Sequence, residues 1–307
     1  MAAAAVAALR SGPGSPAATP DADVATPPSS DPRPDGGPSA PPPAALRCAD
    51  DMALIPAGAF TTGLPDALRA PADPPRERRA VRAFCVDRVE VTLGDWLRCR
   101  AAGACADPPR DATEDVAGVA RARAAISARC AGSMMDAPRH ERLPMNCVDY
   151  TSAQAFCAWR GRRLPTEDEW ELAARGREGR PLPWGDAAPD AERLNACGRE
   201  CVAALRAEGY RGSLSTMYDL DDGADGPAPV GSHPAGATPE GVMDLAGNVA
   251  EWVTRTRALD ADVLQVVRGG SWFSARAVSV YPALRLAVRS DRRNPQTGFR
   301  CAADVGR

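Results

Sequence analysis

The chain has 307 residues, and 44% of them are hydrophobic, which is enough to bury the core of one large domain or of two ordinary ones. Its formal net charge at pH 7 is -3, and all of its basic residues are arginines. Domains that bind nucleic acid normally carry a basic face or stripe, so this charge argues against a nucleic-acid partner.

Residues 1–47 differ in composition from the rest of the chain. They are rich in Pro, Ala, Ser and Gly and have almost no large apolar side chain, which predicts an extended tether without a core. The opening MAAAAVAAL is weakly apolar, too short to span a bilayer, and lacks the basic start of a signal peptide. An apolar start, a proline-rich stalk and a cysteine-rich domain are nonetheless the usual order of an exported protein. We therefore expect a longer signal or anchor ahead of this start, and membrane contact through such an anchor alone.

Ten cysteines are spread over the remainder of the chain, an even number that predicts disulfides and an oxidising compartment. The pairing cannot be read from the sequence, although two short spacings, Cys99 to Cys105 and Cys197 to Cys201, suit small closed loops. A zinc site is disfavoured because neither of the two histidines lies near a tight cysteine pair. The protein is therefore expected outside the cytoplasm, as a periplasmic, secreted or surface-tethered protein.

Residues 48–307 show no second break in composition and no repeat, which predicts one domain. Glycine and proline recur throughout, so loops should outweigh regular elements. Strands are expected over residues 52–63, 82–92 and 297–305, with apolar side chains alternating from Phe84 to Val91. A strand near each end of the domain predicts that the two ends pair in a closed α+β domain.

Three short amphipathic helices are expected within residues 91–103, 150–161 and 164–176. Thr92 can cap the first, while Thr151 with Gln154 and Thr166 with Glu169 predict capping boxes for the other two. Charged side chains around the third helix are expected to form ion pairs at the surface, namely Arg162, Arg163, Glu167 and Glu171. Four tryptophans are expected in the core: Trp159, Trp170, Trp184 and Trp252.

Three motifs are specific in combination: RGRRLPTEDEWE, LAGNVAEW and RGGSW. Together with MALIPAGAFTTG, CVDRVEVTLGDW, LPWGD, APVGSHP and GFRCA, in this order, they resemble the sulfatase-modifying-factor, or formylglycine-generating-enzyme-like, domain family. The resemblance extends from about Met52 to Cys301. It implies a C-type-lectin-like α+β fold that is rich in loops and has short helices.

The resemblance also implies two structural calcium sites. The first takes the side chains of Asp244 and Glu251 and the carbonyls of Gly247 and Val249, within MDLAGNVAEW. Oxygen donors on a flexible turn suit Ca²⁺, although these residues alone favour a hydrogen-bonded turn, and it is the resemblance that favours calcium. The second takes Asn195, the Ala196 carbonyl, Asp222 and the Ala224 carbonyl. An insert that carries cysteines precedes that segment, so Asp221 and Asp225 are alternatives to Asp222.

Catalytic members that this chain resembles carry two cysteines after RGGS, which bind copper and use oxygen to convert a sulfatase cysteine to formylglycine. Without gaps from Ser271, these positions hold Ser274 and Ser279. A serine hydroxyl stays protonated, binds Cu(I) poorly and has no thiol redox chemistry, so copper is not expected. Ser274 is not expected to act as a hydrolytic nucleophile either, because neither histidine lies in a recognisable base motif.

The function that these observations favour is a non-catalytic module that binds a protein, peptide or glycan in the former active-site cleft. The residues expected to line that cleft are Arg268, Ser271, Trp272, Ser274, Arg285 and Arg289. The alternative is that the arginines among them hold the loops in place and do not contact a ligand. The competing functions are an enzyme that acts on a protein or small thiol through a metal site not evident in the sequence, and a purely structural envelope or secreted component.

Overall fold

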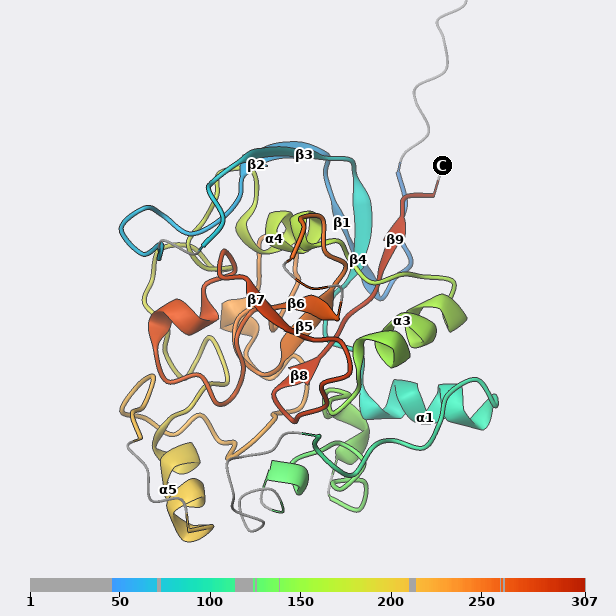
Figure 1. Cartoon of the computed structure of the whole chain (residues 1–307), viewed down its shortest axis with the longest axis vertical. Coiled ribbons are helices and arrows are strands. Elements are labelled where there is room, and N and C mark those ends of the chain that lie inside the picture. The colour runs from blue at the N-terminus through green and yellow to red at the C-terminus, as the bar shows by residue number, and fades with distance from the viewer. Residues whose placement is uncertain are drawn as a thin grey trace, which may run out of the picture. The chain divides into compact units, whose positions relative to one another are not determined.

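The computed structural model describes residues 46–70, 73–113, 124, 126–137, 139–209, 214–259, 261 and 263–306. Within them, three small sheets and several short helices are joined by long irregular segments, which confirms the expected loop-rich α+β architecture (Figure 1). The tether expected at residues 1–47 lies almost wholly outside the described residues. None of the described helices combines the length and the apolar character that crossing a bilayer requires.

One sheet joins the two ends of the domain. Its strands are β1 (Met52–Ile55), β4 (Phe84–Asp87) and β9 (Ala302–Asp304), with β4 in the centre and antiparallel to both neighbours. Beside them, the Arg47 amide donates to the Gly306 carbonyl at 3.3 Å. The ends of the domain therefore lie together, as the sequence predicts, although the first and last strands meet through β4 and not directly.

Two details of the expected strands are wrong. Pro56 divides the predicted strand 52–63 into β1 and β2 (Gly58–Thr61), and β2 pairs with β3 (Arg78–Val81) in a separate two-stranded sheet. The strand predicted to continue through Val91 with alternating apolar side chains instead ends at Asp87. Glu90, which that pattern would expose, is buried, with 1% of its surface exposed.

The third sheet has four strands in the order β7-β6-β5-β8 and lies near the middle of Figure 1. Its members are β5 (Ala250–Val253), β6 (Leu264–Arg268), β7 (Leu286–Arg289) and β8 (Thr297–Gly298). The connection from β6 to β7 contains the RGGSW motif and a short 3-10 helix, η3 (Ala277–Val280). This connection carries the two serines at the positions of interest.

The α-helices with described bounds are α1 (Leu93–Ala101), α3 (Tyr150–Trp159), α4 (Glu167–Arg175) and α5 (Arg199–Ala207), and the one-turn 3-10 helices η1 (His140–Arg142) and η2 (Pro234–Gly236) accompany them. Thr92 caps α1, and Thr166 forms the predicted capping box with Glu169 at the start of α4. The box predicted for α3 is wrong. Asp149 caps that helix instead by accepting from the Ser152 amide at 2.8 Å, so Thr151 lies inside the first turn.

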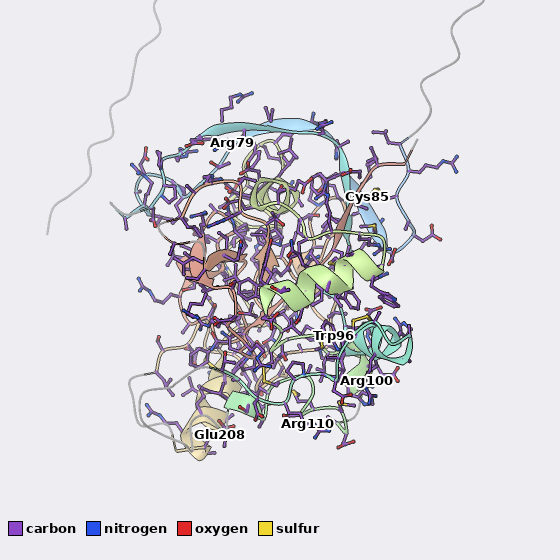
Figure 2. The ribbon with its side chains drawn as sticks, turned by 45° about the vertical axis from the view of Figure 1, so that its right-hand side comes forward. Arg79, Cys85, Trp96, Arg100, Arg110 and Glu208 are labelled. Carbon is purple, nitrogen blue, oxygen red and sulfur yellow. A yellow bond between two sulfur atoms is a disulfide. The ribbon has the colours of Figure 1, made fainter. Side chains whose placement is uncertain are left out.

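Aromatic side chains fill the interior between these elements. The rings of Trp96 on α1 and Phe156 on α3 stack with centroids 5.6 Å apart, and the two helices lie side by side in Figures 1 and 2. Trp170 and Trp252 are fully buried, as expected. Trp159, the last residue of α3, is 42% exposed, although its ring lies 5.7 Å from that of the buried Phe156, so it is not a core residue as expected.

Five disulfides pair all ten cysteines: Cys48–Cys85, Cys99–Cys105, Cys130–Cys147, Cys157–Cys301 and Cys197–Cys201. The two short loops suggested by the spacing are both closed. The longest link spans 144 residues and ties α3 to the residue just before β9. Such a density of disulfides is typical of proteins that fold in an oxidising compartment.

Candidate functional site

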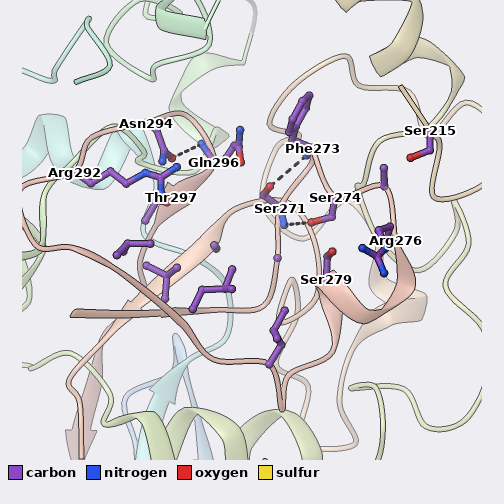
Figure 3. A pocket seen from close by; sticks show the side chains of 17 residues that line it. Ser215, Ser271, Phe273, Ser274, Arg276, Ser279, Arg292, Asn294, Gln296 and Thr297 are labelled. Carbon is purple, nitrogen blue, oxygen red and sulfur yellow. Dashed lines mark hydrogen bonds between the residues drawn. The ribbon is translucent and has the colours of Figure 1, made fainter. Parts of the chain in front are cut away.

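A cavity of about 330 Å³ lies against the four-stranded sheet, beneath the connection from β6 to β7 (Figure 3). All four strands contribute to its lining, through Ala250 of β5, Val267 of β6, Leu286 and Val288 of β7 and Thr297 of β8. The remaining lining residues come from the connection between β6 and β7 and from the loop before β8, together with Ser215. The volume lies at the low end of the range for small-molecule sites.

Gly270 brings the two serines onto one wall of this cavity. Its φ of 72° is left-handed, and a Cβ at this position would lie 2.4 Å from the Ser279 carbonyl oxygen and 3.0 Å from Ser274 Oγ. A side chain here would therefore push both serine segments apart. The Ser271 amide donates to Ser274 Oγ at 3.0 Å, which fixes the direction of that hydroxyl (Figure 3).

The serine wall is supported from behind. The Ser274 carbonyl accepts from the Cys197 amide at 3.0 Å, within the turn that the Cys197–Cys201 disulfide closes. Trp272 lies beneath, 3% exposed, and its indole N–H donates to the Pro295 carbonyl at 3.1 Å. The wall is thus built on a covalently closed turn and a buried aromatic anchor, which makes it rigid.

The lining offers no group that would activate a serine. Among the described lining residues there is no Asp, Glu, His or Cys. A serine nucleophile needs a base within hydrogen-bond reach, and Ser274 Oγ is instead held by a backbone amide. The described lining thus holds neither a thiol nor a carboxylate or imidazole beside Ser274.

Two of the six residues expected to line the cleft, Ser271 and Ser274, do line the cavity, and the other four do not. Trp272 lies behind the wall, as described above. Arg289 is exposed and pairs with Asp291, with its guanidinium 2.6 Å and 2.9 Å from the two carboxylate oxygens. It lines a neighbouring hollow with Leu264 and Ala287 instead. The remaining two, Arg268 and Arg285, bind Glu167 at the start of α4 instead.

Arg268 and Arg285 brace the interior through Glu167 at the start of α4. Arg268 is 1% exposed and reaches Glu171 at 3.0 Å and Glu167 at 3.4 Å, while Arg285 Nε donates to Glu167 at 2.7 Å. Both glutamates are fully buried, so the surface ion pairs expected for them are wrong. Burial alone would raise the pKa of Glu167, but its bonds to Arg285 and Arg268 outweigh burial and lower the pKa to about 2.

The first implied calcium set falls in an interior with excess negative charge. Asp244, Glu251 and Glu90 are all buried, and Arg300 is the guanidinium that faces them. Burial, with repulsion between these carboxylates, raises the pKa of Glu90 and of Asp244. Glu251 accepts two bonds from Arg300 and one from the Trp170 indole, all at 2.7 Å, which leaves room for about one more partner. The charge excess fits a bound cation.

The backbone brings the two implied calcium sets together. Gly247 has a φ of 88° and lies very close to the segment that holds Asn195. A Cβ at this position would lie 2.4 Å from the Asn195 carbonyl oxygen, so the close approach requires glycine. The next amide, of Asn248, donates to that same carbonyl at 2.8 Å, and the Val249 amide donates to Glu90 at 3.2 Å. The predicted residues of MDLAGNVAEW thus form one tight turn against the segment that holds Asn195.

In the second set, Asp222 lies against the Ala196 segment. Its carboxylate accepts from the Ala196 amide at 3.0 Å, from the Ala224 amide at 3.1 Å and from the Tyr218 hydroxyl. Burial raises the pKa of Asp222 despite these bonds. Of the alternatives, Asp225 is exposed and lies beside Arg129. Asp221 is also exposed, but one of its oxygens lies within 4.8 Å of oxygens of Asp222 and Glu200.

Asn195 supplies the observation that bears most directly on a cation. Its amide nitrogen donates to the Gly226 carbonyl at 2.9 Å and to the Asn248 side chain at 3.0 Å, which fixes the orientation of the amide. Its Oδ1 is buried, and no donor among the described residues reaches it. A buried oxygen without a partner costs free energy that a cation would recover. The oxygen donors of this set therefore fit Ca²⁺.

A family model described as the sulfatase-modifying factor enzyme 1-like domain matches residues 38–305. The chain belongs to the sulfatase-modifying-factor family. The mouse protein named inactive C-alpha-formylglycine-generating enzyme 2 is 36% identical over 171 residues, which cover 54% of this chain and 50% of that protein. The formylglycine-generating enzyme of Mycobacterium tuberculosis is 32% identical over 184 residues, 52% of this chain and 57% of the relative.

A third relative of this sulfatase-modifying-factor domain is the hercynine oxygenase of Mycolicibacterium thermoresistibile, 34% identical over 57% of this chain and 39% of that protein. The chain spans about half the length of the curated relatives that it matches. Among solved structures, PvdO from Pseudomonas aeruginosa aligns with a TM-score of 0.60 and 25% identity, covering 86% of this chain and all of that one. The Treponema denticola variable protein 1 aligns at 0.56 and 17% identity, which supports the shared fold.

Several residues that shape the site of this sulfatase-modifying-factor domain escape sequence reasoning. Arg276 and Arg292 line the cavity, whereas the sequence favoured the arginines of the RGG and AVR segments. Glu90 joins the buried carboxylates although it stands between two valines in an apparent strand pattern. The position of Glu90 between Val89 and Val91 was the signal that the sequence offered. A carboxylate buried among apolar residues needs a charged or metal partner.

Proposed function

We propose that this chain is a non-catalytic sulfatase-modifying-factor domain that works outside the cytoplasm and binds a protein, peptide or glycan in the cavity beneath the RGGSW loop. The observation that carries this proposal is the pair of serines, Ser274 and Ser279, on the cavity wall, at the positions that the resemblance, counted without gaps from Ser271, implies for the copper-binding cysteines of catalytic members. The relative named inactive formylglycine-generating enzyme 2 is consistent with it. The five disulfides support export.

Soft Cu(I) prefers thiolate ligands, and every cysteine of the chain is in a disulfide. The competing reading, an enzyme that holds a metal differently, requires carboxylate, imidazole or thiolate ligands around the cavity. The described lining contains none of these groups. In a non-catalytic domain the RGGSW loop acts as a rigid frame that positions a ligand. Its backbone hydrogen bonds hold it in place without any reaction at the site.

Copper affinity tests this proposal. The purified disulfide-intact chain, titrated with Cu(I) against a competing chelator, will retain no stoichiometric copper, because two hydroxyls replace the thiolates. The matched variant Ser274→Cys/Ser279→Cys restores both thiols at the same wall and is expected to retain about one equivalent. Stoichiometric Cu(I) binding by the unaltered chain, lost in Ser274→Ala, would show that the cavity keeps a metal site and would overturn the proposal.

We also propose that calcium stabilises the fold at the sets containing Asp244 and Asn195. At a calcium concentration about 100 times Kd, binding to the native state adds about 2.7 kcal/mol, or roughly 5 to 10 °C in Tm for a domain of this size. Differential scanning calorimetry of a verified metal-free sample, with and without calcium, measures the shift. The variant Asn195→Leu removes the partnerless oxygen and should reduce it, whereas Asp221→Asn should change it less. A Tm indifferent to calcium would contradict this proposal.

A further inference from the structure

The connection between β6 and β7, residues 269–285, carries the serine wall of the cavity (Figure 3). Most of its own backbone hydrogen bonds are local, such as the one from the Ser279 amide to the Arg276 carbonyl at 2.9 Å. Among the described residues, three backbone hydrogen bonds join it to segments elsewhere in the chain. The position of the serine wall therefore depends on the segments at which these three bonds end.

Two of the three bonds end on the turn of the first implied calcium set. The Gly247 amide donates to the Gly269 carbonyl at 3.0 Å, and the Trp272 amide donates to the Asn248 carbonyl at 2.8 Å. Asn248 lies between Gly247 and Val249, the two residues whose carbonyls are implied ligands of that set. The turn that would hold a cation therefore also holds the RGGSW loop.

The third bond ends on the second implied set. The Cys197 amide donates to the Ser274 carbonyl at 3.0 Å, and Cys197 directly follows Ala196, whose carbonyl is an implied ligand. That carbonyl and the Cys197 amide belong to one peptide group. A cation on the carbonyl oxygen would polarise the group and strengthen the bond that its N–H donates, because hydrogen bonds in a chain reinforce one another.

Both anchoring segments carry features that a cation would stabilise. Asp244, Glu251 and Glu90 are buried together, so their negative charges repel one another. The buried Oδ1 of Asn195 has no donor within the described part of the chain. The Cys197–Cys201 disulfide closes its own turn, but hydrogen bonds set the place of that turn against the loop. The backbone that anchors the serine wall is thus the backbone that calcium would stabilise.

We propose that calcium at these two sets fixes the serine wall in place and so prepares the cavity for its ligand. The inference rests on the proposed binding function and adds the regulation of that site. A wall that calcium has already ordered spares the ligand the cost of ordering it. Calcium and ligand then strengthen each other's binding, because coupling between two sites is reciprocal.

Amide hydrogen exchange of the unaltered, disulfide-intact chain tests this coupling without a known ligand. A verified metal-free sample is compared by mass spectrometry with one in excess calcium. Amides of residues 269–285 should exchange at least about tenfold more slowly with calcium, because local opening of the loop breaks the three anchoring bonds. The internal control is the separate sheet of β2 and β3, which should slow by a smaller factor.

Matched variants assign the effect to the second set. Asp222→Asn should raise the calcium concentration that half-protects residues 269–285 by about tenfold, because it removes a charged oxygen ligand. Asp219→Asn makes the same chemical change at an exposed ion pair with Arg199 and should leave that concentration unaltered. Each variant is first checked without calcium for an unchanged near-UV circular dichroism spectrum and Tm.

The geometry of the wall can be measured directly with Ser274→Cys/Ser279→Cys. Its two thiols bind one Cu(I) tightly only when the wall holds them at ligand distance. We expect its Cu(I) affinity, titrated against a competing chelator, to be at least about tenfold higher with calcium than without. Equal affinity in the two conditions would show that the wall does not depend on calcium.

A calcium-dependent rise in Tm without slower exchange in residues 269–285 would overturn the inference while leaving calcium stabilisation standing. Equal slowing in these residues and in β2 and β3 would show general stabilisation of the fold and would also overturn it. Indifference of both Tm and exchange to calcium would overturn the inference together with the calcium sets. Failure of the proposed binding function appears separately, as copper retention by the unaltered chain.

Discussion

Replacing Glu167 by glutamine will lower the free energy of unfolding by about 3 to 5 kcal/mol, because it takes the carboxylate from Arg285 and leaves the buried Arg268 with Glu171 alone. Glu167 lies at the start of α4 and joins Arg285 and Arg268, which come from the two sides of the RGGSW connection. The same carboxylate accepts from the Thr256 and Arg257 amides at 2.8 Å and 3.0 Å. Urea unfolding measures the loss.

The pH dependence of this effect has a definite sign. The pKa of Glu167 is lowered from 4.5 to about 2 in the folded state, so its stabilisation is present above pH 4.5 and is lost as pH falls toward 2. The difference between the native chain and Glu167→Gln should therefore narrow over that interval. Asp291→Asn, which breaks the exposed pair with Arg289, should change stability little. A Glu167→Gln protein as stable as the unaltered chain at neutral pH would refute the bracing role.

Removing the Cys157–Cys301 disulfide will cost about 4 to 5 kcal/mol, because its loop is long and the unfolded chain gains the corresponding conformational freedom. The link spans 144 residues and ties α3 to the residue before β9. We expect the double variant Cys157→Ala/Cys301→Ala to unfold at a much lower urea concentration. It should also show weakened pairing of the two ends of the domain, detectable as faster amide exchange in β9.

The matched control is Cys99→Ala/Cys105→Ala, which opens a loop with a sequence separation of 6 and should cost about 2 kcal/mol. The comparison cancels the chemical effect of losing two sulfur atoms. If both double variants lose the same stability, the long link does not act by constraining the unfolded chain.

The features that local sequence dictates were predictable. The caps at Thr92 and Thr166 depend on residues three positions away, so they follow from the sequence directly. The two short disulfides were predictable for the same reason, because their cysteines lie only 6 and 4 positions apart in the sequence. The cap of α3 was misplaced because Asp149 competes with Thr151, and aspartate is the stronger cap.

Features that depend on distant contacts were not predictable from one sequence. Glu167 reads as a surface charge on an amphipathic helix, and its burial follows from Arg285, which lies 118 positions away. The arginines of the cavity illustrate the same limit. The arginine of RGG is adjacent to the serine loop in sequence but faces the interior, whereas Arg276 and Arg292 reach the cavity from the ends of irregular segments.

Turnover of a sulfatase-type substrate tests the central claim most directly. A peptide bearing the C-x-P-x-R motif is incubated with the purified disulfide-intact chain, copper, a thiol reductant and air, and its cysteine is followed by mass spectrometry. Our account predicts an unchanged peptide, while a catalytic family member run in parallel converts it, because serines at positions 274 and 279 cannot hold copper as thiolates do. Formation of formylglycine above the protein-free control would contradict it and would require a catalytic metal site in this chain.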